Sequence, residues 1–202
     1  LTCTELYSEE ATATCCTLTY KCYLSGAWAA GGALITARRT SGAAGTQNAG
    51  LVFGGATPTV VSCNEEYNGS AFSAGTALIN ARCDLAGAGT QNAGLAIGGA
   101  SPAKDLSEEY DGTNWTAGGT MITARFALAA AGTQNAAVTF AGYTPADLTC
   151  TEEYNGTSWS SGGAMINARR ALAGFGTQNA ALAAGGDPTT ALTEEYDGSS
   201  VH

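Results

Sequence analysis

Short runs of small and apolar residues alternate with turn residues along most of the chain. No segment shows the three-to-four-residue apolar spacing of an amphipathic helix. The unit that begins at Arg125 predicts a strand of small side chains, RFALAAAGT, then a tight TQNA turn and a returning strand, AAVTFAG. We expect the turn asparagine to supply left-handed backbone geometry. LTCTEEYNG then predicts a third strand ended by an Asn-Gly turn, and Trp159 opens a fourth.

This pattern repeats with a period of about 44 residues. GTQNA occurs at 45–49, 89–93, 132–136 and 176–180, and each repeat also carries a tyrosine, a large apolar residue five positions later and an arginine ten positions beyond that. Four short strands in such a unit match one blade of a β-propeller. Leucine-rich and β-helix repeats are too short, and helical repeats would need amphipathic segments.

The order of a glycine doublet, tyrosine, tryptophan and arginine resembles the kelch repeat, and kelch-like proteins of bacteriophages and environmental bacteria are the most similar. The resemblance covers residues 17–200. It implies an all-β fold, a propeller of four or five four-stranded antiparallel blades, related to the galactose-oxidase-like type. The third repeat departs from the pattern, since FAGY at 140–143 replaces the glycine doublet.

The predicted organisation is one propeller domain. It consists of a cysteine-rich N-terminal partial blade, three blades and a C-terminal partial blade, at residues 1–35, 36–79, 80–122, 123–166 and 167–202. Both ends carry a third-strand segment, TLTYKCYLSG at 17–26 and ALTEEYDGSS at 191–200. Two such segments cannot occupy one position in a blade. A ring of four blades therefore remains an alternative to the ring of five that we favour.

Charge and composition exclude several classes of partner. Charged residues make up 12% of the chain, and the formal net charge of −9 comes from 17 acidic and 8 scattered basic residues. Without a basic cluster to displace counterions, we expect no binding to nucleic acid and no attraction to anionic membranes. No apolar run reaches the ~20 residues of a membrane span.

Cysteine and histidine usage argues against metals and cofactors. His202 is the only histidine, so a galactose-oxidase type copper site and a Ser/His/Asp relay are excluded. Cys15, Cys16 and Cys22 lack CxxC spacing, and each YDG turn offers one carboxylate, so we predict neither zinc nor calcium. Cys63 and Cys150 stand where other repeats have leucine, which predicts small buried apolar side chains.

The repeated glutamate pairs before each tyrosine are not interpreted as catalytic. Neighbours in a strand point to opposite faces, so a pair such as Glu152 and Glu153 cannot converge on one substrate atom. We expect one glutamate to pair with the repeat arginine. Turns such as DGTNW at 111–115 are one residue short of a sialidase Asp-box, and no asymmetric acid and nucleophile pair accompanies them. We therefore predict that the chain is not an enzyme, although a fragment of a larger carbohydrate-active enzyme remains an alternative.

The remaining prediction is a structural or adhesive module on a virion, such as a phage tail or capsid, or on a cell surface. It would bind protein subunits of a larger assembly or, alternatively, a surface glycan in the manner of a lectin. The residues expected to hold the blades together are Tyr67, Tyr110, Trp115, Tyr154, Trp159, Arg82, Arg125 and Arg169. The residues expected to form a polar binding ring on one face are Gln47, Asn48, Gln91, Asn92, Gln134, Asn135, Gln178 and Asn179.

Overall fold

The computed structural model describes residues 28–100 and 102–198. They divide into two units at Ala30 and Gly31, and every strand lies in the second unit. Within the described ranges the chain forms fifteen β-strands and no helix, and so no helix that could cross a membrane. The N-terminal cysteines and most of the predicted first partial blade, residues 1–27, lie outside these ranges.

The strands form four antiparallel sheets, each a blade built from consecutive strands. Blade 1 comprises β1 (Gly42–Thr46), β2 (Ala49–Phe53), β3 (Asn64–Tyr67) and β4 (Phe72–Gly75). Blade 2 comprises β5 (Ala86–Thr90), β6 (Ala93–Ile97), β7 (Ser107–Tyr110) and β8 (Trp115–Ala117). Blade 3 comprises β9 (Ala129–Thr133), β10 (Ala136–Phe140), β11 (Thr151–Tyr154) and β12 (Trp159–Ser161). Blade 4 has three strands, β13 (Ala173–Thr177), β14 (Ala180–Ala184) and β15 (Thr193–Tyr196).

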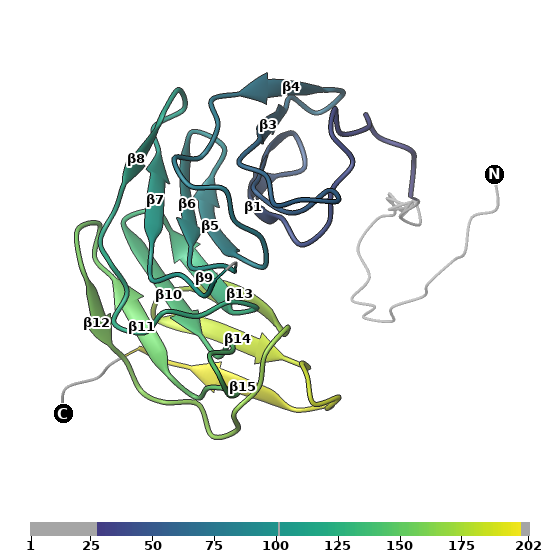
Figure 1. Cartoon of the computed structure of the whole chain (residues 1–202). Coiled ribbons are helices and arrows are strands. Elements are labelled where there is room, and N and C mark those ends of the chain that lie inside the picture. Colours follow the sequence, from purple (N-terminus) through teal and green to yellow (C-terminus); the bar gives the residue numbers. More distant parts are fainter. Residues whose placement is uncertain (1–27, 101, 199–202) are drawn as a thin grey trace, which may run out of the picture. The chain divides into compact units, whose positions relative to one another are not determined.

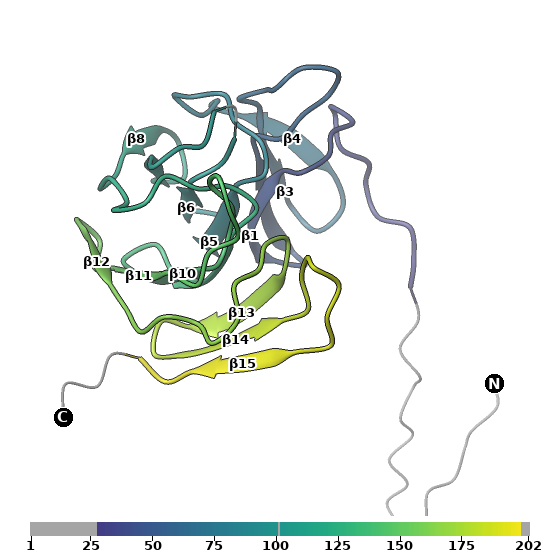
Figure 2. The same cartoon turned by 60° about the horizontal axis from the view of Figure 1, so that its bottom comes forward.

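The four blades are arranged in a ring as a β-propeller, which confirms the predicted all-β propeller fold (Figures 1 and 2). The described residues form four blades, not the five that the sequence analysis favoured. Their first strands pack in series, β1 on β5, β5 on β9 and β9 on β13. No comparable packing of β13 on β1 occurs in the described part of the chain. Each blade therefore has a leading face, turned toward the preceding blade, and a trailing face, turned toward the next one. Among the described residues, no further blade packs on the leading face of blade 1 or on the trailing face of blade 4.

Glycine, not asparagine, supplies the unusual geometry of the GTQNA turns. Gly45 has a φ of +98°, and a Cβ atom added there would lie 2.2 Å from the carbonyl oxygen of Ala49. Gly132 repeats this geometry with a φ of +103°. The expected left-handed asparagine was wrong, because none of the four turn asparagines has a positive φ. The first residue of GTQNA is thus fixed by sterics.

Packing between blades is dominated by the predicted aromatic side chains. Tyr110, Trp115, Tyr154 and Trp159 are all buried, as expected. Trp115 lies 5.0 Å, centroid to centroid, from Phe53 of blade 1, and so covers the trailing face of that blade. These rings are needed because the first strands contribute mainly alanine and glycine.

The cysteines of the blades are thiols without disulfide bonds. Cys63 and Cys150 are half-buried, so the expectation of full burial was wrong. Both lie just before the third strand, on a loop at the blade edge where side chains are only partly covered.

Candidate functional site

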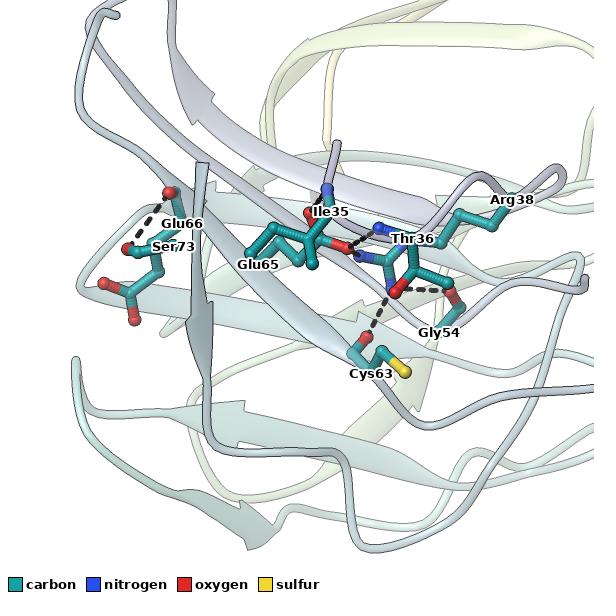
Figure 3. Close-up of polar contacts among 8 residues, drawn as sticks. All are labelled: Ile35, Thr36, Arg38, Gly54, Cys63, Glu65, Glu66 and Ser73. Atoms are coloured by element: carbon teal, nitrogen blue, oxygen red, sulfur yellow. Dashed lines mark hydrogen bonds and ion pairs between the residues drawn. The ribbon is translucent and has the colours of Figure 1, made fainter. Parts of the chain in front are cut away.

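An arginine and a glutamate form a buried ion pair in every blade, shown for blade 1 in Figure 3. The Glu65 carboxylate pairs with Arg38 and accepts hydrogen bonds from the backbone N–H groups of Ile35 (2.8 Å) and Thr36 (3.0 Å). Arg38 also donates to the carbonyl oxygen of Cys63 at 2.7 Å. The pair thus ties the loop before β1 to β3.

The same pair recurs at each predicted arginine: Arg82 with Glu108, Arg125 with Glu152, and Arg169 with Glu194. Burial lowers the pKa of Arg82, and the attraction of Glu108 acts against that shift. Because Glu108 is also held by the backbone of Ile79 and Asn80, its carboxylate has no free lone pair aimed at solvent. The prediction that the repeat arginine pairs with a glutamate or carbonyl is confirmed, and the role is structural.

The second glutamate of each pair serves the next blade. The hydroxyl of Tyr110 donates to Glu66, and that of Tyr154 donates to Glu109. Tyr196 makes the same contact with Glu153. Burial, followed by the hydrogen bond to Glu109, raises the pKa of Tyr154. The two glutamates therefore point to opposite faces, one into its own blade and one toward its neighbour.

Three of the four glutamines predicted to form a binding ring are used between blades. Gln91 donates to the carbonyl oxygens of Gly50 (3.0 Å) and Tyr67 (2.8 Å) in blade 1. Gln134 and Gln178 repeat this contact with blades 2 and 3. Gln47 is the exception, since it is exposed and makes no side-chain hydrogen bond with the described residues. The glutamine side chains are therefore clamps between blades.

A line of backbone hydrogen bonds also connects the blades, through residues that the sequence analysis missed. The N–H of Asp84 donates to the carbonyl of Thr40, that of Ala127 to Asp84, and that of Ala171 to Ala127, each at 2.8 Å. All four residues have φ values of 51° to 52°, the left-handed region that non-glycine residues rarely adopt. The hydrogen bonds explain how this strained geometry is stabilised. No repeated glycine or asparagine marks these positions, so the sequence gives no signal of them.

The asparagines of the GTQNA turns do remain on the surface. Asn48, Asn92, Asn135 and Asn179 are exposed, as are the threonines two positions before them. Each asparagine packs against a glycine of the neighbouring turn between the third and fourth strands, as Asn92 does against Gly112. In that turn Asp111 accepts hydrogen bonds from the N–H groups of Asn114 and Thr113, which lower its pKa. The Asp111 carboxylate thus stabilises the turn in which it lies.

Four isoleucines form a second repeated surface feature, which sequence analysis missed. Ile35, Ile79, Ile122 and Ile166 have exposed fractions of 61%, 57%, 61% and 85%. They occupy the same place in each blade, on the loop before the first strand, where the isoleucine N–H binds the paired glutamate. The preceding side chain, such as Leu78 or Met121, is buried instead. The repeated letters [LM]-I-[TN]-A-R contained the signal, but alternation alone does not say which residue faces solvent.

Two cavities border blade 4, and neither is lined by a catalytic constellation. The first, of about 380 Å³, is lined by Phe140, Met165 and Tyr196 and occupies the place that Trp159 fills beside Tyr154 in blade 3. The second, of about 440 Å³, lies on the trailing face beside Phe175, Leu182 and Glu195. No cluster of metal-binding side chains occurs among the described residues.

Comparison of the sequence with models of known protein families and with curated proteins found no match. The class that the geometry defines is thus a four-bladed β-propeller, and its function must be argued from its own surfaces.

Proposed function

We propose that this chain is a non-enzymatic binding module of a surface assembly, which docks a protein subunit through the four exposed isoleucines. The observation that carries the proposal is their regular exposure. This isoleucine is exposed in all four blades, whereas large repeated side chains such as Leu78, Trp115 and Trp159 are buried. Because the blades form a ring, the four side chains lie on one face, where the loops before the first strands run.

The engagement of the repeated carboxylates within the fold supports a binding role. Among the described residues, the repeated glutamates of blades 1 to 3 are held by arginines or by tyrosines of the next blade. A reaction would need an asymmetric group with an accessible proton or lone pair. The repeated carboxylates do not offer one.

Glycan binding is the second candidate, on the opposite face. The exposed threonines and asparagines of the GTQNA turns form an uncharged polar rim that can donate and accept hydrogen bonds. Sugar recognition would also benefit from an exposed aromatic ring in each blade, but Trp115 and Trp159 are buried and only the first tryptophan, Trp28, is exposed. This favours the protein partner.

The kelch-like order of repeat residues supports kinship with kelch-type propellers of phages and environmental bacteria. On this basis we propose a location on a virion or at a cell surface. The low content of charged residues, 12% of the chain, fits a component that is packed into an assembly.

The test compares two variants for binding to intact particles or cells of the source, measured with fluorescently labelled protein. One variant replaces the four isoleucines, Ile35, Ile79, Ile122 and Ile166, with serine. The other replaces the four exposed asparagines with alanine, and circular dichroism and thermal unfolding establish that both remain folded. We expect the serine variant alone to lose binding. Binding lost only in the asparagine variant, together with a signal on immobilised glycans, would favour the lectin. Binding of both variants as strong as that of the wild type would show that neither surface is the binding site.

A further inference from the structure

The contact between consecutive blades consists of the same hydrogen bonds at all three junctions. In each, the following blade donates a tyrosine hydroxyl to a glutamate, a glutamine amide to two carbonyls, and a backbone N–H to the line that starts at Thr40. The preceding blade accepts these three kinds of bond, and in return the N–H of its Gly55, Gly99 or Gly142 donates to the carbonyl oxygen of Arg82, Arg125 or Arg169 in the following blade. The two end blades therefore carry complementary halves of this contact.

The trailing face of blade 4 carries the accepting half. Glu195 is the counterpart of Glu66, Glu109 and Glu153, and it is exposed. The backbone carbonyls of Ala181 and Tyr196 correspond to those that Gln178 binds in blade 3. The carbonyl of Ala171 corresponds to that of Ala127 and accepts no backbone hydrogen bond within the described ranges. Leu182, whose counterpart Val138 is fully buried, is only half-buried.

The leading face of blade 1 carries the donating half. Tyr67 is half-buried, whereas Tyr110 and Tyr154 are each 1% exposed. Gln47 is exposed, and the N–H of Thr40 donates no backbone hydrogen bond to any described residue. Ala43 is exposed too, although its counterpart Ala130 is buried against the preceding blade.

We propose that the trailing face of blade 4 binds the leading face of blade 1 of a second copy of this chain, head to tail. In this contact the second copy donates from Tyr67 to Glu195 and from Gln47 to the carbonyls of Ala181 and Tyr196. A second copy of the chain fits this face because the chain carries both halves of a contact that it already makes three times. Such a contact is heterologous: it closes with two or more copies or continues into a filament.

One side chain makes this junction different from those within the chain. Phe175, 58% exposed, stands where the other blades have Ala44, Ala88 and Ala131. In the proposed contact the second copy covers this ring. Phe175 thereby adds buried apolar area to the junction.

The experiment uses the full chain in analytical ultracentrifugation over a range of concentrations. Ala43→Arg blocks the leading face of blade 1, and Glu195→Arg blocks the trailing face of blade 4. Both positions are exposed in the single chain, so neither change alters a buried side chain, and circular dichroism checks that both variants are folded. We expect the wild type to associate and each variant alone to weaken association by about 30-fold or more. An equimolar mixture of the variants restores one junction, so it should form a complex of two chains.

Three results would overturn the proposal. The wild type could remain a monomer at the highest soluble concentration, which includes the case in which the chain's own residues cover blade 4. Both variants could associate as tightly as the wild type. The mixture could stay monomeric while the wild type associates. The proposed function is tested separately, because the isoleucine-to-serine variant should associate normally and Ala43→Arg should keep its binding to particles or cells.

Discussion

Strands β11 and β15 have the same four residues, TEEY, and a very different degree of burial. In β11 three of the four side chains are buried, whereas in β15 none is. The strand pairing is the same, since Tyr154 and Tyr196 face equivalent alanines of the second strand. The difference arises because blade 3 has a fourth strand and a following blade. Local sequence therefore sets the strand, and neighbouring blades set its burial.

The largest effect should come from the tryptophan that blade 3 has and the described part of blade 4 lacks. Replacing Trp159 with alanine should lower the free energy of unfolding by ~3–5 kcal/mol, because it empties a site between blades 2 and 3. Phe175→Ala in blade 4 should cost far less, since Phe175 is 58% exposed. Urea unfolding of the two variants at low protein concentration measures this. Equal losses would contradict the comparison.

The ion pairs should show the same contrast. Glu152→Ala leaves the buried guanidinium of Arg125 unpaired and should cost about 3 kcal/mol. The side chain of Glu194 is more exposed, 12% against 2% for Glu152, so water can partly replace it beside Arg169. Glu194→Ala should therefore be the milder change in chemical denaturation. A larger loss at Glu194 would show that blade 4 is better covered than β15 indicates.

Glutamine substitutions should lower stability at a junction between two blades of the chain but not on the leading face of blade 1. Gln178→Ala removes two hydrogen bonds to blade 3 and should cost ~1 kcal/mol. Gln47→Ala should leave the stability of the single chain unchanged. Thermal unfolding of both variants below the concentration at which copies associate tests this pair.

The tyrosine hydroxyls should make the stability of the protein fall at alkaline pH. The pKa of Tyr154 is raised above its unfolded value of ~10, so the folded state holds this proton more tightly. Its contribution to stability is complete below pH ~10 and is lost as the pH rises through the higher folded pKa. Tyr154→Phe should therefore flatten the decline of stability above pH ~10, measured by urea unfolding at a series of pH values. If the stability of Tyr154→Phe declined with pH as steeply as that of the wild type, Tyr154 would not be the cause of the decline.

Much of the fold could be predicted because the repeat places large and charged residues at fixed positions. Trp159 and Arg125 stand out in a chain of small side chains. Because such residues recur at the same position of the repeat, burial between or within the blades was the simplest explanation for them. The candidate site was harder. Gln134 reads as a surface turn residue, since its acceptors are backbone carbonyls of another blade, which leave no trace in the sequence. The exposure of Ile122 could not be predicted for a similar reason. Its backbone N–H, not its side chain, binds Glu152, so the side-chain type does not reveal the contact.

The choice of main-chain carbonyls as acceptors has a consequence for how such a chain changes over generations. Gln91 and Gln134 bind carbonyls of glycine, and Gln178 binds that of Ala137, with the same geometry. Because each glutamine binds only a backbone carbonyl, the side chain at the accepting residue can change without loss of the hydrogen bond. Repeats joined in this way can be duplicated, deleted or exchanged by recombination, and each new neighbour still presents an acceptable partner.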